Sequence, residues 1–210
     1  NMRKKGGCGG RVEAGPDCRK ANITSGAAKQ DFYACAAVEL CKATCNASPS
    51  LTTGPIAYVW CNEPFYYNNG ASDASNYDAL SYNCADPLRG WNNKISYSGN
   101  YTYKNPFDSY YTGSLKPPYN NPNANPPIGI YLDPETGDLI FTPVKCDEIT
   151  VAVLEVTEWR KNASGKYEVI GVTRRDMPFI RKQCRGNHTP IIKETLTPTG
   201  CEGSKICYVM

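Results

Sequence analysis

The sequence predicts an all-β protein, and three observations support an antiparallel β-sandwich. Residues that favour strands and turns are abundant, with 15 Tyr, 18 Gly and 16 Pro among 210 residues. Short β-branched and aromatic runs recur along the chain, and turn signals separate them. About seven such strands are typical of a sandwich. One stretch, 31–44, fits a helix, but it fits a strand equally well.

The expected strands follow one another between residues 56 and 180. Their ranges are 56–60, 63–67, 77–83, 128–132, 139–141, 149–156 and 167–173, and the last continues towards Ile180. Two turn signals are especially clear. Asp133-Pro-Glu-Thr-Gly137 separates the fourth strand from the fifth, and Asn162-Ala-Ser-Gly165 closes a hairpin between the sixth and the seventh.

A repeat of cysteine-containing segments predicts the domain organisation. The stretches 45–49 and 184–190 both join a cysteine to Asn-x-Ser/Thr-Pro. A second cysteine follows each stretch, Cys61 after the first and Cys201 after the second, and these two are 140 residues apart. We therefore expect the end of one repeat at 1–45, a complete repeat at 46–186 and the start of the next at 187–210. A long irregular insertion is expected within the complete repeat, at about 84–127. Both ends look cut, so we expect a fragment of a longer protein.

Eleven cysteines predict disulfide bonds and an oxidising compartment. A metal site is less well supported, because the closest pair, Cys41 and Cys45, lacks the spacing typical of zinc ligands. The odd count leaves at least one cysteine free or paired outside this chain. The disulfide candidates are the six that recur with the repeat: Cys8, Cys45, Cys61, Cys146, Cys184 and Cys201.

Two pairing schemes remain open for these six cysteines. They are Cys45–Cys61 with Cys184–Cys201, and Cys8–Cys45 with Cys146–Cys184. A hairpin turn centred near 163–164 favours the second scheme, because it places Cys146 and Cys184 at the ends of neighbouring strands. The other five are Cys18, Cys35 and Cys41, which could pair among themselves, and Cys84 and Cys207, which lack an obvious partner.

Several motifs resemble a known family. They include Gly70-Ala-Ser-Asp73, Asp78-Ala-Leu-Ser-Tyr82, Leu132-Asp-Pro-Glu-Thr-Gly-Asp138, Val156-Thr-Glu-Trp-Arg160 and Gly171-Val-Thr-Arg-Arg-Asp176. The first three resemble Ig-like (cadherin-like and PKD-like) repeats. The last two are similar to repeats of very large surface proteins of Bacteroidota, which carry gliding-motility adhesion domains and leave the cell by type IX secretion. The resemblance covers about 45–184 and recurs at 185–210.

The resemblance implies a non-enzymatic adhesin or stalk repeat at the extracellular cell surface, serving gliding motility or surface attachment. Its implied partners are neighbouring repeats, surface polysaccharide or other surface proteins, and the type IX secretion machinery. Two alternatives stay open: a self-assembling extracellular filament that uses strand complementation, and a carbohydrate-binding accessory module. Nucleic acid is not an expected partner, because no basic cluster extends beyond residues 3–5. No apolar run is long enough to span a membrane.

No catalytic residue is expected. His188 is the only histidine, and it lies in the junction motif, where the other copy has Ala47. Glu155 and Glu158 are near in sequence, but we expect them on a solvated strand face, ion-paired across the strands to Arg174 or Arg175. The residues themselves require no cofactor.

Calcium is the one cofactor that the resemblance suggests, because cadherin-like repeats often hold Ca²⁺ through Asp and Glu oxygens. The candidate ligands are Asp73, Asp78, Asp133 and Asp176, with Asp138 nearby in the same turn as Asp133. The competing expectation is that each aspartate caps its own turn.

An aromatic-rich stretch within 84–127 is the candidate ligand surface. Its candidates are Trp91, Tyr101, Tyr103, Tyr110, Tyr111 and Tyr119. Tyrosine gives contact area at a low entropic cost. The alternative is that these rings pin an irregular loop against the sandwich.

Overall fold

The computed structural model describes residues 2–4, 9–19, 22–26, 28, 30–39, 41–42, 45–55, 57–73 and 78–182. Every regular element among them is a β-strand, which confirms the all-β prediction and settles the stretch from residue 31 as a strand. The strands form one seven-stranded sheet, one three-stranded sheet and two small two-stranded sheets. All the pairs are antiparallel except one, β5 with β14.

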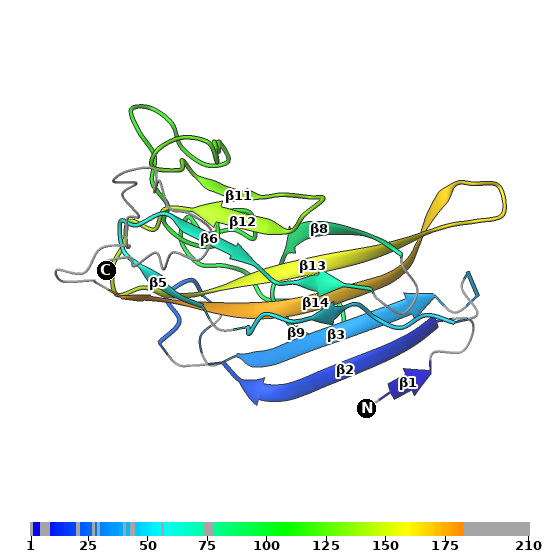
Figure 1. The fold of residues 1–210 in the computed structure, drawn as a ribbon. Helices are drawn as coiled ribbons and strands as arrows, with labels where there is room; N and C mark the ends of the chain where they lie inside the picture. The colour runs from blue at the N-terminus through cyan, green and yellow to red at the C-terminus, as the bar shows by residue number, and fades with distance from the viewer. Residues whose placement is uncertain are drawn as a thin grey trace, which may run out of the picture.

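The seven-stranded sheet has the order β1-β2-β3-β14-β13-β8, and β5 pairs with β14 off this path. Its strands are β1 (Met2–Lys4), β2 (Gly9–Cys18), β3 (Asp31–Glu39), β5 (Ala57–Trp60), β8 (Ala79–Ala85), β13 (Ile149–Lys161) and β14 (Tyr167–Lys182). Figure 1 shows β13 and β14, in yellow and orange, running along the middle of this sheet between the blue strands β2 and β3 and the green β8.

The β13–β14 hairpin confirms the predicted hairpin and extends beyond its predicted strands. Pairing runs from Ile149 opposite Ile180 to Lys161 opposite Tyr167. The turn forms because the Asn162 side chain accepts hydrogen bonds from the backbone N–H groups of Ser164 and Lys166, at 3.0 Å each.

The three-stranded sheet has the order β11-β12-β6. Its strands are β11 (Ile130–Leu132), β12 (Asp138–Phe141) and β6 (Phe65–Asn68). The predicted turn between β11 and β12 is present: Asp133 Oδ1 accepts hydrogen bonds from the N–H groups of Glu135 and Thr136, at 2.8 Å each. Gly137 has a φ of 78°, which a β-carbon would strain.

Four short strands make up the two smaller sheets. They are β4 (Ser50–Leu51) with β7 (Ala71–Ser72), and β9 (Leu88–Gly90) with β10 (Asn93–Lys94). The β4–β7 pair precedes β8, so the chain reaches the edge of the large sheet directly after it.

The main hydrophobic core joins residues of the seven-stranded and the three-stranded sheets. Val59 of β5, Phe141 of β12 and Phe179 of β14 are completely buried in it. The ring of Phe107, from the irregular stretch before β11, is equally buried and lies 4.4 Å from the Phe141 ring between centroids. Burying each of these side chains stabilises the fold by about 1.5–3 kcal/mol.

The large sheet continues across the predicted boundary at residue 45. In the register, Cys35 of β3 lies opposite Arg174 of β14, and Val38 lies opposite Gly171. Strands before residue 45 therefore share a sheet with strands that follow it. The division into three repeats stays a prediction, and the segment 187–210 lies outside the described residues.

One disulfide joins Cys61 to Cys146, with 5.4 Å between the Cα atoms. Both cysteines were candidates, but neither predicted scheme contains this pair, so the pairings Cys45–Cys61 and Cys146–Cys184 are wrong. The physical reason is the parallel placement of β5. Tyr58 of β5 and Ile149 of β13 both flank Ile180 of β14, so the chain leaving β5 meets the chain entering β13.

The remaining cysteines divide into two groups. Cys35, Cys45 and Cys84 are free thiols, and Cys41 is disulfide-bonded. Cys8, Cys184, Cys201 and Cys207, and the side chain of Cys18, lie outside the described part of the structure. A pairing of Cys35 with Cys41 and the predicted pairing of Cys8 with Cys45 are therefore wrong, because Cys35 and Cys45 are free.

Candidate functional site

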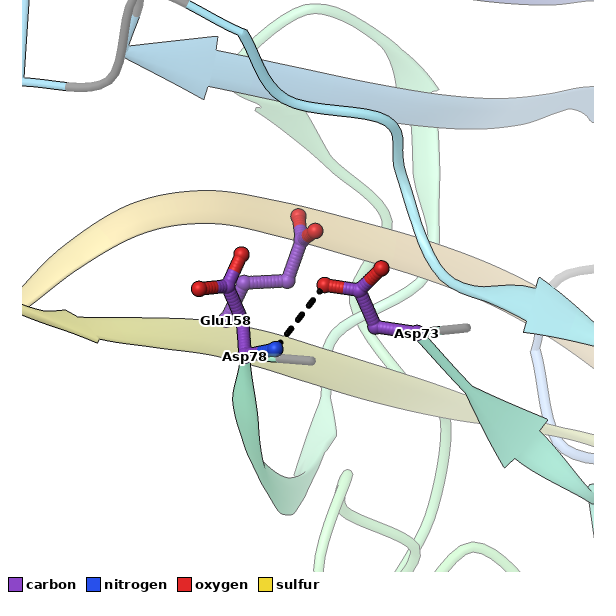
Figure 2. Close-up of side chains that lie close together, drawn as sticks. All are labelled: Asp73, Asp78 and Glu158. Carbon is purple, nitrogen blue, oxygen red and sulfur yellow. Dashed lines mark hydrogen bonds between the residues drawn. The ribbon is translucent and has the colours of Figure 1, made fainter. Parts of the chain in front are cut away.

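Three carboxylates converge near the turn of the β13–β14 hairpin. Asp73 directly follows β7, Asp78 directly precedes β8, and Glu158 lies on β13. Because Ala79 of β8 pairs with Trp159 of β13, Asp78 is brought beside the hairpin. One carboxylate oxygen from each of the three lies within 4.8 Å of the others. Figure 2 shows these side chains, which we call the acidic cluster, approaching from separate segments.

Arg160 holds one member of the acidic cluster in place. Its guanidinium donates to both oxygens of Asp78, at 2.7 and 2.6 Å. The same group donates to the side-chain oxygen of Asn46 and to the carbonyl of Cys45, at 3.1 and 3.0 Å. The bidentate geometry holds the Asp78 carboxylate in one orientation, and the two further hydrogen bonds tie residues 45–46 to the hairpin.

Glu158 is the most deeply buried member of the acidic cluster, with an exposed fraction of 0%. Its Oε1 accepts a hydrogen bond from the Asn46 amide at 3.2 Å, whereas Oε2 has no hydrogen-bond partner among the described residues. Burial raises the pKa of Glu158 to about 7; the negative charges of Asp73 and Asp78 add to the increase, and Asn46 and Arg160 oppose it.

The predicted cross-strand ion pair is therefore confirmed for one glutamate, and the predicted solvated face is wrong for the other. Glu155 pairs with Arg174 across the hairpin at 2.5 Å, as expected. Glu158 is buried, and the amide of Asn46 is the hydrogen-bond partner of its carboxylate. Residues an odd number of positions apart on a strand face opposite sides of the sheet. Glu158 accordingly follows Leu154 and Val156 on the core side.

Gly171 provides the space that the Glu158 carboxylate occupies. The two residues lie opposite each other in the hairpin register. A β-carbon at position 171 would collide with Glu158 Oε2 and would lie 3.2 Å from the Asn46 amide nitrogen. Position 171 therefore requires glycine, because the Glu158 carboxylate lies too close to its backbone for a β-carbon.

The other two predicted calcium ligands, Asp133 and Asp176, lie elsewhere. Asp133 caps its turn, and hydrogen bonds from the N–H groups of Thr136 and Glu135 lower the pKa of its carboxyl group. Asp176 is buried and forms an ion pair with Arg19. The structure thus brings together two of the four predicted ligands and adds Glu158, which was not predicted as a ligand.

The predicted aromatic surface is only partly exposed. Trp91 and Tyr119 are 40% and 45% exposed. The other four candidates are half-buried: Tyr101, Tyr103, Tyr110 and Tyr111. The hydroxyl of Tyr101 donates to Glu148 at 2.5 Å, which agrees with a ring that anchors the loop.

Further exposed aromatic side chains lie on two strands that were not predicted to bind a ligand. Tyr58 and Trp60 alternate with buried residues along β5, and they are 58% and 45% exposed. Tyr66 of β6 is 64% exposed. The alternation around residues 57–60 was the available sequence signal, since alternate residues of a strand share a face.

His188, the one histidine of the sequence, lies outside the described residues. No helix of the described chain is both long and apolar enough to cross a membrane. No family model matches the chain, and comparisons with curated proteins and with solved structures find no match either.

Proposed function

We propose that this chain is a non-enzymatic, extracellular repeat with an Ig-like β-sandwich fold, serving as a stalk or adhesive unit of a larger cell-surface protein. The observation that carries the proposal is the Cys61–Cys146 disulfide. Such bonds persist in oxidising compartments and are rare in the cytosol. The hydrophobic core shared by two sheets supports the sandwich.

The position of the disulfide suits a load-bearing role. It closes a loop over a sequence separation of 85 residues, and the whole three-stranded sheet lies inside that loop. Tension applied outside the loop cannot extend the residues within it while the bond is intact. In the chain-entropy model a loop of this size contributes about 4–5 kcal/mol to stability.

Single-molecule pulling tests the load-bearing role. Replacing both Cys61 and Cys146 by Ser should lengthen the fully extended chain by about 280–310 Å, because about 3.3–3.6 Å is released per residue. The variant should also unfold at a lower force than the oxidised chain. The double variant leaves the bond at Cys41 intact, so the change reports on this disulfide alone. An equal extended length with and without the bond would contradict the stalk role.

Antibody labelling of the producing cells tests the location. We expect intact cells to be labelled, and mass spectrometry of the native protein should find Cys61 joined to Cys146. Labelling only after permeabilisation, with both thiols reduced, would overturn the proposal.

The aromatic pair on β5 favours the adhesive form of the proposal. Tyr58 and Trp60 share one exposed face, and aromatic side chains of this kind offer rigid contact area. Insoluble chitin and cellulose are suitable probes for surface polysaccharide. Sedimentation with them should be lost in the double variant Tyr58→Ser/Trp60→Ser and retained in Tyr167→Ser, whose ring is 50% exposed on the hairpin. Equal binding by both variants would exclude this surface.

A further inference from the structure

The acidic cluster concentrates negative charge in a buried place. Asp73 and Glu158 have exposed fractions of 9% and 0%, and the Asp78 side chain has 3%. The guanidinium that contacts the cluster, that of Arg160, is already engaged by both oxygens of Asp78. Buried carboxylates are ordinarily matched by cations or by several hydrogen bonds. The described contacts leave Glu158 with neither.

The unpartnered oxygen of Glu158 is a second, independent observation. Oε2 is buried and has no hydrogen-bond partner among the described residues. Gly171 leaves it space that any larger residue would fill. A positively charged ligand would satisfy this buried oxygen, which lies beside two further carboxylates.

We propose that the acidic cluster binds one divalent cation of the calcium class, with a carboxylate oxygen from each of Asp73, Asp78 and Glu158 as ligands. The donors are all oxygens, which hard cations prefer. One oxygen from each residue lies within 4.8 Å of the others, which is close enough for all three to share one Ca²⁺ at ligand distances of about 2.3–2.6 Å.

A bound cation would connect three parts of the fold. It would join the end of β7 and the start of β8 to the β13–β14 hairpin, and the Asn46 amide would hold Glu158 from outside. Three carboxylates and one guanidinium leave a charge that a divalent cation neutralises. The site would bind a cation whether or not the chain serves adhesion.

Calorimetric titration of CaCl₂ into the full chain, freed of metal with a chelator and held at pH 8, tests the proposal. We expect one bound Ca²⁺ per chain and a calcium-dependent rise in the unfolding temperature. Glu158→Gln and Asp73→Asn should each weaken binding at least tenfold, since even residues that only orient ligands change metal affinity by about 10–100-fold.

Two control variants remove a carboxylate elsewhere. Glu135→Gln changes an exposed residue, and Asp133→Asn changes a residue that caps its own turn. Both should bind Ca²⁺ as the unchanged chain does. Circular dichroism establishes that each variant is folded, and Asp73→Asn decides the question if Glu158→Gln does not fold. Absence of binding in the unchanged chain, or binding that Asp73→Asn leaves intact, would overturn the proposal.

Discussion

Two buried glutamates near opposite ends of β13 are treated differently by the fold. Glu148, directly before the strand, forms an ion pair with the buried Arg181 and accepts a hydrogen bond from Tyr101. Glu158, near the hairpin turn, has the Asn46 amide as its hydrogen-bond donor and two further carboxylates beside it. The first is neutralised by the protein itself. The second is not. We therefore assign a structural role to Glu148 and a ligand-binding role to Glu158.

Removing the positive charge of Arg181, beside Glu148, should have the largest effect on stability. Arg181→Met removes the buried ion-pair partner of Glu148, so we expect a loss of about 3–5 kcal/mol in the free energy of unfolding. Lys145→Met is the matched control, because Lys145 is half exposed and lies 3.9 Å from the same carboxylate. It should change stability by less than about 0.5 kcal/mol. Urea denaturation measures both, and equal effects would contradict the comparison.

At the other end of β13, Glu158 should make the stability of the chain depend on pH. When a chelator has removed metal ions, burial raises the pKa of Glu158 to about 7. The folded chain then holds this proton more tightly than the unfolded chain does. The contribution of Glu158 to the free energy of unfolding is therefore fully present below pH about 4.5. It is lost as the pH rises to about 7, by about 1–3 kcal/mol after allowance for solvent screening.

The difference between the unchanged chain and Glu158→Gln isolates this effect, because other groups titrate in the same interval. Burial also raises the pKa of Asp176 to about 6, against the influence of Arg19. Asp176 is present in both proteins, so its contribution cancels. Parallel stability curves from pH 4.5 to 8 would show that Glu158 does not titrate as described.

Glu155 should give the smallest effect. It lies on the same strand as Glu158 but on the opposite face, half-buried and paired with Arg174. Glu155→Gln should cost about 0.2–1 kcal/mol, the usual contribution of a cross-strand charge pair. Calcium binding should be unchanged in this variant. A loss of calcium binding would place the ligand set on the wrong face of β13.

Local signals predicted much of the fold. The turns at Asp133–Gly137 and Asn162–Gly165 were recognisable because Asn, Asp and Gly bond or bend the backbone where they stand. The disulfide was not predictable in the same way. Its partners meet because β5 runs parallel to the end of β14, which is a contact between distant segments. Phe107 likewise enters the core from an irregular stretch without periodicity.

The candidate site was predictable in part. Asp73 and Asp78 are five positions apart, so their proximity follows from sequence distance. The burial of Glu158 had a usable signal, since it continues the alternation of Leu154 and Val156. The role of Asn46 had none, because its amide meets the acidic cluster from a segment 112 residues away.

The most direct test of the account compares the unchanged chain with Glu158→Gln at pH 8, by urea denaturation with a chelator and with CaCl₂. In the chelator the variant should be the more stable protein, because it lacks a buried charge without a cation. In CaCl₂ the order should reverse, because only the unchanged chain gains the free energy of metal binding. The same order of stability under both conditions would contradict the claim that the acidic cluster is a cation site.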